Sequence, residues 1–366
     1  MTSLARLCSR GAACPALSSS RRGVPGIARI PSPHQGLRPL RHVFTRGARA
    51  PTTRTVMASA GKPSVSTRIA ETDVPCIVDM QRMMRGKEGV LSLAQGITHW
   101  QPPASALDAA VVAVKERATS SYGADDGAAD LKAALQTKLA EENGLPNSEV
   151  MVTSGANQAF VNLVLTLTDA GDEVVFFRPY YFNHLMAVQM TGGKSAVTFG
   201  PCCEDTMHPD LDWLEGLLAG PGPPPKMVVV VNPCNPSGVL MGRRELERAR
   251  DLCAAAGTWL VMDNTYEHFT YDGREHVCVS GPHVINVFSF SKAYGMMGWR
   301  VGYIAWDKEG AADLGSELLK AQDTIPICPC QISQRVALAA LGEGRGWVQE
   351  RVDGLAPNRE AVMAAL

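Results

Sequence analysis

MVVVVNPCNPSGVLMGRRELERARDLCAAAGTWLVMDNTY, residues 227–266, is the stretch that decides the fold of this chain. Its β-branched run 227–231 predicts a buried strand, because four consecutive valines suit a pleated, fully covered position. Residues 243–256 alternate charged and apolar side chains at helical spacing, and 259–262 form a second apolar run. Strand, helix and strand in this order indicate a mainly parallel sheet covered by helices.

The same alternation extends on both sides of this stretch. Predicted strands are 150–153, 173–177, 195–199, 227–231, 259–262, 283–289 and 301–306. Predicted helices are 158–168, 181–191, 210–218, 243–256, 314–322 and 331–341. The proline-rich segment 221–225 can be neither helix nor central strand, so it predicts a surface loop. The expected fold class is therefore α/β, with a large domain that contains the sheet and a smaller second domain.

Charge divides the chain into two opposite parts. Residues 1–70 contain eleven Arg, one Lys and no Asp or Glu, which leaves 23 basic and 36 acidic residues for 71–366. The excess of acidic residues over 71–366 makes nucleic acid an improbable partner. No apolar run reaches the ~18 residues of a membrane span. An N-terminal segment without Asp or Glu predicts an organelle transit peptide over 1–60. The expected location of the protein is the plastid, with the mitochondrial matrix as the alternative. A disordered basic arm is the other interpretation.

The ten cysteines do not suggest a metal site. No Cys-x-x-Cys pair is present, and neither Cys202-Cys203 nor the Cys328-Pro-Cys330 segment has a matching histidine cluster. Free thiols are the expected state of the eight cysteines in the body, and no bound metal is expected.

Polar side chains gather in the loops that follow the predicted strands, where an open α/β sheet builds its site. Lys292 follows the strand 283–289, and Arg300 comes eight residues later. A partly buried lysine beside another cation has the lowered pKa that a nucleophilic amine needs, and a guanidinium suits a phosphate. Taken singly, either residue would more often be an ordinary solvated or ion-paired side chain.

Four other segments carry candidate residues, each with a structural alternative. Asp263 ends a strand and could balance a protonated pyridine nitrogen, or simply cap a helix. Asn235 lies in a proline-bounded turn and could point its amide at a phenolic oxygen, or belong only to the turn. Gly155, Ala156 and Asn157 join a strand to a helix and could form an anion site, or only a tight turn. Tyr181 offers an aromatic face, for which buried packing is the alternative.

Taken in order, these motifs resemble the class I and II aminotransferases of fold type I. The likeness rests on five stretches: Gly155-Ala156-Asn157, Tyr181, Asn235-Pro-Ser-Gly238, Asp263 with Tyr266, and Ser289-Phe-Ser-Lys292 with Arg300. Closer likeness to plant aromatic aminotransferases, which use aromatic amino acids or methionine with 2-oxo acids, rests on 91–96, 100–103, 287–300 and 325–328. The resemblance implies a pyridoxal 5'-phosphate enzyme with a ping-pong transamination mechanism.

The resemblance also implies a role for each matching residue. Lys292 would bind the cofactor as a Schiff base and then act as acid and base. Asp263 would hold the pyridine nitrogen, Asn235 and Tyr266 the 3-oxygen, and Tyr181 would stack on the ring. The phosphate would be held by residues from two loops, namely Ser289, Arg300, Gly155, Ala156 and Asn157.

Three further positions concern the partner subunit and the substrate. Tyr122 would reach the phosphate bound by the neighbouring subunit of a homodimer, while Gly96 and Trp100 would line the substrate pocket. An aspartate-type aminotransferase or a C-S β-lyase would share the cofactor residues, so both stay open as alternatives.

The expected domains are an N-terminal arm with part of the small domain over 61–105, the large cofactor-binding domain over 106–340, and the start of the C-terminal small domain over 341–366. Members of the family bind the substrate carboxylate through an Arg in a C-terminal segment, which we do not find before Leu366. A truncated sequence is the expected explanation, and a non-catalytic cofactor-binding protein is the alternative.

Overall fold

One mixed sheet forms the centre of the computed structural model, which describes residues 63–193 and 196–366. Its strands are β1 (Ser148–Thr153), β2 (Val174–Phe177), β3 (Val197–Gly200), β4 (Met227–Val231), β5 (Trp259–Asp263), β6 (Val284–Ser289) and β7 (Gly302–Asp307). They lie in the order β1-β7-β6-β5-β4-β2-β3, and only β7 runs antiparallel to its neighbours. The predicted α/β class with a mainly parallel sheet is confirmed.

The predicted strands match these seven to within one or two residues at each end. Ser195, the first residue of the third predicted strand, lies outside the described residues, as does the predicted transit peptide 1–60. The proline-rich segment 221–225 is a loop before β4, as expected. The domain boundaries at 105 and 340 stay predictions.

Helices surround the sheet within the described residues. Those after β1 are α5 (Ala156–Leu167), α6 (Phe182–Gly192), α7 (Leu211–Leu218), α8 (Arg243–Ala256), α9 (Leu314–Thr324), α10 (Gln331–Gly342), α11 (Gly344–Asp353) and α12 (Ala356–Ala365). Before β1 lie α1 (Thr67–Glu71), α2 (Cys76–Met84), α3 (Ala104–Ala113), the 3₁₀ helix η1 (Arg117–Ser120) and α4 (Ala129–Glu142). The sequence analysis assigned no elements to this earlier part of the chain.

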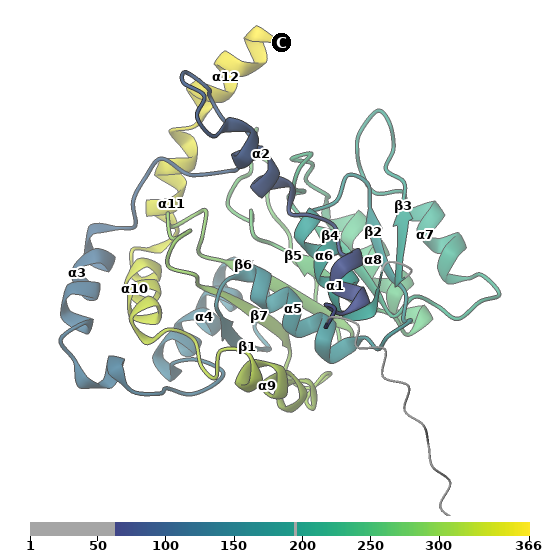
Figure 1. Ribbon diagram of the computed structural model, residues 1–366, viewed down its shortest axis with the longest axis horizontal. Helices are drawn as coiled ribbons and strands as arrows, with labels where there is room; N and C mark the ends of the chain where they lie inside the picture. Colours follow the sequence, from purple (N-terminus) through teal and green to yellow (C-terminus); the bar gives the residue numbers. More distant parts are fainter. Residues whose placement is uncertain (1–62, 194–195) are drawn as a thin grey trace, which may run out of the picture. The chain divides into compact units, whose positions relative to one another are not determined.

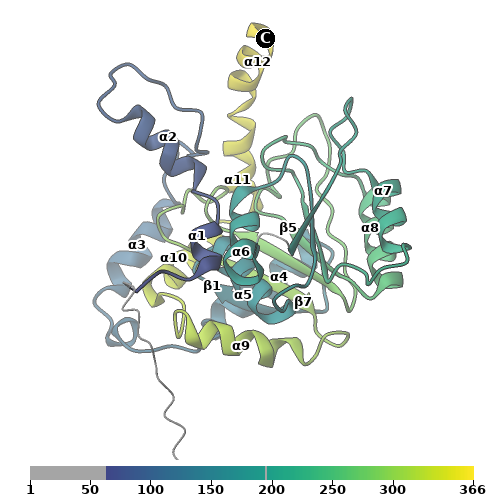
Figure 2. The ribbon, with the colours of Figure 1, turned by 45° about the vertical axis from the view of Figure 1, so that its right-hand side comes forward.

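Both faces of the sheet are covered, because alternate strand residues point to opposite sides. Met151, Val261 and Val287 pack on one side with α5, α6 and α9. Residues of opposite parity pack on the other side, where α3, α4 and α10 cover the β1, β7 and β6 half and α7 and α8 cover the β5, β4 and β2 half. In Figure 1, α10 lies beside α3, and Figure 2 shows α9 next to α5.

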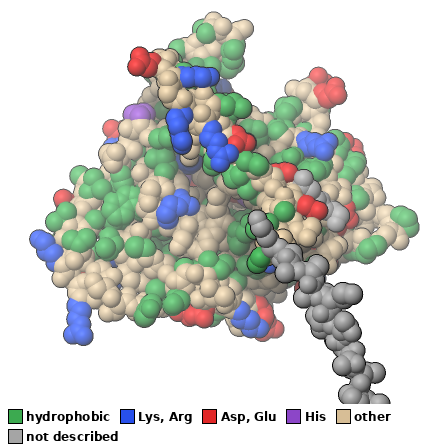
Figure 3. Space-filling view, viewed as in Figure 1, with side chains coloured by type: hydrophobic (Ala, Val, Ile, Leu, Met, Phe, Trp, Pro, Cys, Tyr) green, Lys and Arg blue, Asp and Glu red, His purple; other side chains and the backbone are tan. Residues whose placement is uncertain are grey.

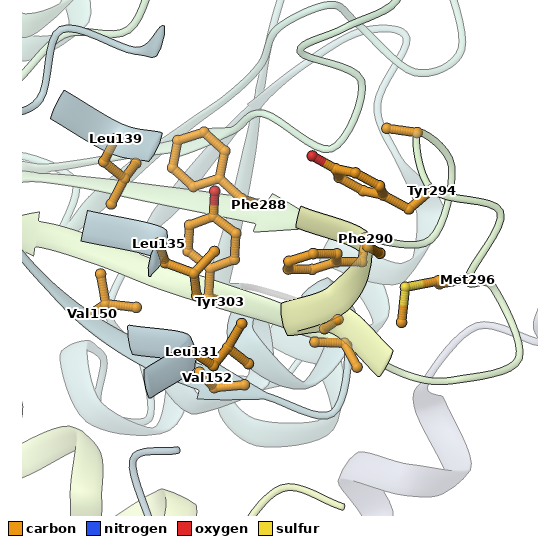
Figure 4. Packing of buried hydrophobic residues seen from close by; sticks show 14 of the residues in the cluster. Leu131, Leu135, Leu139, Val150, Val152, Phe288, Phe290, Tyr294, Met296 and Tyr303 are labelled. Atoms are coloured by element: carbon orange, nitrogen blue, oxygen red, sulfur yellow. The ribbon is translucent and has the colours of Figure 1, made fainter. Parts of the chain in front are cut away.

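The aromatic part of the core lies directly below the loop that carries Lys292. Phe288 and Tyr303 stack with ring centroids 4.8 Å apart, and Phe290 and Tyr294 lie 5.1 Å apart. Figure 4 shows the rings of Phe288 and Tyr303 beside the leucines of α4. Since rigid, fully buried rings hold the backbone on both sides of Ser289, the loop that follows β6 has a fixed starting point.

Local signals in the sequence explain where individual helices begin and end. The Asp210 carboxylate accepts hydrogen bonds from the N–H groups of Asp212 and Trp213 and so caps α7. Gly257 ends α8 in the left-handed region with φ +68°, where a residue without a Cβ is favoured. In the described part of the chain, no helix has the length and apolar character needed to cross a membrane.

Candidate active site

The loops that carry the predicted site residues meet at one edge of the sheet. Strands β1, β2, β4, β5 and β6 point the same way, so their carboxyl ends share that edge. The antiparallel strand β7 starts there, which places Arg300 at the same edge. An open α/β sheet binds its ligands at this edge.

Lys292 lies at the centre of this edge, next to the N-terminal arm. Its Nζ donates a hydrogen bond to the carbonyl oxygen of Gly96. A Cβ placed on Gly96 would lie 3.8 Å from that Nζ and 3.7 Å from the Tyr266 hydroxyl. Burial, and after it the charge of Arg300, lower the pKa of Lys292 below its usual 10.5. The structure thus joins Gly96, Tyr266 and Lys292, and the predicted direction of the lysine pKa is confirmed.

Asp263 is a buried carboxylate at the end of β5. Its Oδ2 lies 3.1 Å from Nε2 of His184, and its Oδ1 accepts a hydrogen bond of 2.9 Å from the N–H of Thr265. Burial by itself would raise the pKa of Asp263, but the bonds from His184 and Thr265 outweigh burial and lower it. Asp263 is therefore ionised at neutral pH, and it does not cap a helix.

Arg300 and the start of α5 form a compact cationic corner. The guanidinium contacts the carbonyl oxygens of Met297 at 3.0 Å and Ser154 at 3.5 Å, and the hydroxyl of Ser291 at 3.4 Å. Gly155 has φ +88°, and any Cβ there would collide with the guanidinium of Arg300. Because the first N–H groups of a helix have no intrahelical partner, the amides of Ala156 and Asn157 add to the positive potential of this corner.

Two aromatic hydroxyls, of Tyr181 and Tyr266, also belong to the site. Tyr181 donates to Oδ1 of Asn157 at 3.3 Å and accepts from Nδ2 of Asn183 at 3.0 Å. Burial raises the pKa of Tyr181 and raises that of Tyr266 to about 12, so both phenols stay protonated. Asn235 is half-buried in the loop after β4.

The remaining predicted positions are Trp100, Tyr122 and Ser289. The Trp100 indole donates to the carbonyl oxygen of Ala293 at 3.2 Å and stacks on Phe269 with centroids 6.4 Å apart. Tyr122 is 82% exposed, so its hydroxyl is available to a neighbouring molecule. The hydroxyl of Ser289 accepts a hydrogen bond from the N–H of Ser291 at 3.1 Å.

His184 is the main residue that the sequence analysis missed. It is 3% exposed, and its ring contacts Tyr181 edge-on at 5.1 Å and Phe160 at 4.1 Å. The signal was its place in the helix, because His184 follows Tyr181 by three positions and so lies on the same face. Ser291 was also missed as a partner of Arg300.

Comparisons with known proteins identify the class to which this fold and site belong. The family model for aminotransferase class I and II matches residues 88–366, and the chain belongs to that family. It is 54% identical over 302 residues to an aromatic aminotransferase, ISS1, of Arabidopsis thaliana, which covers 82% of this chain and 76% of that protein. It is 30% identical over 293 residues to an aspartate aminotransferase of Rhizobium meliloti, with 78% of this chain and 69% of that protein covered.

Solved structures show the same fold. A mutant of Thermus thermophilus aspartate aminotransferase superposes with a TM-score of 0.74 at 27% identity, over 82% of this chain and 80% of that one. An aromatic aminotransferase of Pyrococcus horikoshii gives a TM-score of 0.68 at 28% identity, over 78% and 76% of the two chains. The protein is a transaminase that uses pyridoxal 5'-phosphate.

The residues present fit this cofactor. Asp263 is an ionised, buried carboxylate, and among the described residues no Lys or Arg forms an ion pair with it. A protonated pyridine nitrogen would give this carboxylate a cationic partner in addition to its bonds from His184 and Thr265. The corner formed by Arg300, Gly155 and the start of α5 suits a phosphate dianion. In the described part of the chain, no cluster of three or more His, Cys, Asp or Glu side chains could hold a metal ion.

Proposed function

We propose that this aminotransferase takes its amino group from an aromatic amino acid or methionine and passes it to a 2-oxo acid. The observation that supports the reaction most directly is the arrangement around Lys292, whose amine lies between Gly96, Tyr266 and the Arg300 corner. A lysine with a lowered pKa is neutral more often at neutral pH, so its amine can bind an aldehyde carbon and can accept a proton.

Each residue of the site then has a task that follows from its surroundings. When bound, pyridoxal phosphate supplies an electron-withdrawing ring that stabilises negative charge on the substrate α-carbon. Asp263 would hold the proton on the pyridine nitrogen, and His184 orients this carboxylate and favours its ionised form. Asn235 and Tyr266 would hold the 3-oxygen, and Tyr181 would lie against the ring, as the family resemblance implies. The Lys292 amine would accept and return the proton that transamination moves.

The phosphate is assigned to the cationic corner. Arg300 and Ser289 bind it from one side, and the backbone around Gly155, Ala156 and Asn157 binds it from the other. Among these contacts Arg300 contributes the full positive charge, so its loss should weaken phosphate binding most.

The preference for aromatic donors is supported by two observations. The 54% identical Arabidopsis relative carries the name aromatic aminotransferase. In addition, Trp100, Phe269 and Tyr266 form an aromatic group beside Gly96, with Tyr266 and Phe269 edge-on at 5.8 Å. A flat, apolar surface favours an aromatic side chain over a carboxylate, which would lose hydration there without gaining a cation.

A panel of amino donors tests this preference. Phenylalanine, tyrosine, tryptophan, methionine and aspartate would be assayed with pyruvate and with 2-oxoglutarate. We expect kcat/KM for aromatic donors or methionine to exceed that for aspartate by about tenfold or more. A preference for aspartate would favour the aspartate-type alternative, supported by the Rhizobium relative. Release of ammonia and a thiol from a cysteine conjugate would indicate a C-S β-lyase.

We also propose a homodimer and a plastid location, with the mitochondrial matrix as the alternative. Apolar side chains of the N-terminal arm are exposed, including Leu91 at 93% and Leu93 at 98%, and a second subunit would cover them. The acid-free, Arg-rich residues 1–60 support import into an organelle. Microscopy of a fluorescent fusion to residues 1–60 tests the location, and a cytosolic signal would contradict it.

A further inference from the structure

Gln322, in α9, is a fully buried amide whose hydrogen-bonding groups are all used. Its Nε2 donates to the carbonyl oxygens of Asp125 at 3.0 Å and Val152 at 3.1 Å. Its Oε1 accepts from Nε2 of Gln158 at 2.9 Å and from Nδ2 of Asn162 at 2.8 Å. A primary amide has two donor hydrogens and two acceptor positions, so four partners satisfy Gln322 completely.

The partners of Gln322 belong to three segments: the segment after Tyr122, the end of β1 and the first turns of α5, of which the last two flank the cationic corner. Val152 is in the last part of β1, directly before the Ser154–Asn157 loop. Gln158 reaches back from α5, where its Oε1 accepts from the N–H of Ser154 at 2.5 Å, and the Ser154 carbonyl in turn contacts Arg300. Asp125 lies three residues after Tyr122. These segments are separated by up to 197 residues from Gln322 in the sequence.

We propose that Gln322 is a positioning residue for the cofactor phosphate, and that it acts through Gln158 and the Ser154 backbone. The inference rests on the proposed function, in which Arg300 and the 154–157 loop hold that phosphate. Gln322 does not touch the corner itself. Its four bonds fix the end of β1 and the first turn of α5 relative to each other, so the free N–H groups of that turn keep their direction.

A residue that only stabilised the fold would behave differently from a positioning residue. Loss of Gln322 should weaken binding of a ligand that carries the phosphate more than binding of the same ligand without it. Pyridoxal lacks the phosphate but keeps the aldehyde that reacts with Lys292. The ratio of the pyridoxal Kd to the pyridoxal phosphate Kd therefore measures how well the corner is organised, independently of global stability and of turnover.

The test titrates full-length apoprotein with each ligand and follows the absorbance of the lysine-bound chromophore. We expect Gln322→Met, which keeps the side-chain length but removes all four hydrogen bonds, to lower the Kd ratio by about tenfold. Gln189→Met is the matched control, because Gln189 is also a buried helical amide, with bonds of 3.0 Å and 2.9 Å to Asp73 and none to the corner. Its ratio should stay within about twofold of wild type, although both variants should melt earlier.

Gln158→Met keeps the proposal testable should Gln322→Met fail to fold, because it breaks only the link between Gln322 and Ser154. It should lower the ratio to a similar extent, and the double variant should be no worse than the more impaired single variant, since both act along one route. An unchanged ratio in folded Gln322→Met or Gln158→Met would overturn the inference.

Arg300→Met separates this inference from the proposed function. If that variant keeps the wild-type ratio, the phosphate does not bind at this corner and both proposals fail. If Arg300→Met lowers the ratio and Gln322→Met does not, the corner binds the phosphate and only the role of Gln322 is wrong.

Discussion

At the scale of single residues, the pKa of the Lys292 amine and the pKa of the Asp263 carboxylate are both lowered, but for different reasons. Burial and the nearby Arg300 lower the pKa of Lys292 by disfavouring its charged form. Asp263 is buried too, yet hydrogen bonds from His184 and Thr265 favour its charged form. Burial alone therefore does not decide the charge state, and the identity of the nearest polar group does.

Lys292→Ala should abolish the chromophore of the lysine-bound cofactor. The proposed site contains no second amine at this position, so borohydride should trap no labelled peptide. The measurement is the absorbance spectrum of the purified variant, followed by borohydride reduction and peptide mapping. Lys308→Ala, in the turn after β7, is the control and should behave as wild type. A reducible chromophore in Lys292→Ala would show that another lysine binds the cofactor.

Asp263→Asn should retain the cofactor but lose activity by about a hundredfold or more. A neutral amide cannot keep the pyridine nitrogen protonated, whereas Lys292 and the cationic corner formed by Arg300 and the start of α5 are unchanged. Cofactor content after gel filtration and kcat/KM with a good donor would be measured together. Turnover close to wild type would remove the role assigned to Asp263.

At the scale of elements, a buried ion pair joins α4 to the segment that follows β5. Lys138 Nζ lies 2.6 Å from both carboxylate oxygens of Glu267, and Asn143 donates to the same carboxylate at 2.7 Å. Glu267 directly follows Tyr266, so the pair anchors the backbone next to a predicted site residue. Burial opposes the charged form of Glu267, but the charge of Lys138 outweighs burial and lowers the pKa from 4.5 to about 2.

Removing only one charge of this ion pair should destabilise the protein more than removing both charges. Lys138→Met leaves an unpaired buried carboxylate and should lower the free energy of unfolding by about 3–5 kcal/mol. Lys138→Met with Glu267→Gln removes both charges and should recover part of that loss. Denaturant unfolding at pH 7 and a fixed protein concentration measures both variants, and equal instability of the single and double variants would contradict the expectation.

Acid should remove the contribution of Glu267 in the wild type. Its pKa is lower in the folded state than the ~4.3 of an unfolded chain, so the stabilisation is complete above that value and is lost as the pH falls towards 2. The shift corresponds to about 3 kcal/mol. The double variant lacks this carboxylate and should lose less stability between about pH 5 and pH 2. An identical acid dependence in both proteins would contradict the assignment.

At the scale of the whole molecule, apolar and aromatic side chains near the site are exposed, and the proposed homodimer would cover them. Tyr122 is 82% exposed, and Ile97, next to Gly96, is 70% exposed. Hydrophobic side chains also reach the surface at several places on the face shown in Figure 3. The exposure of Tyr122 agrees with the proposal that it serves the cationic corner of a second subunit.

Mixing two inactive variants should restore activity if the sites are shared. Tyr122→Phe and Lys292→Ala chains that exchange subunits would form one hybrid site with both wild-type residues, so up to about half of the hybrid sites should be active. Activity of tagged, purified heterodimers would be compared with each parent. A verified heterodimer no more active than its parents, or an active monomer in size-exclusion chromatography, would refute the shared site.

The sequence by itself determined the order and type of the elements from β1 to α10, but not α11 and α12. The valine run of β4, the amphipathic pattern of α8 and the apolar run of β5 have local causes, because side-chain period and turn residues act within a few positions. Those same periods located the loops that carry Asp263, Lys292 and Arg300. Sequence could therefore predict that these residues share one edge of a sheet, since parallel strands end together.

Only the tertiary structure decided which residues from distant parts of the chain contact one another. Nothing local links Gly96 to Lys292, His184 to Asp263, Lys138 to Glu267 or Gln322 to Gln158, because the two members of each pair are 79 to 196 residues apart in the chain. The burial of polar side chains such as Asp263, Lys138 and Gln322 is tolerated only because the fold gives each of them a partner. Buried polar residues interrupt the hydrophobic pattern of a helix, so their role can be recognised only when the structure shows which group they bond to.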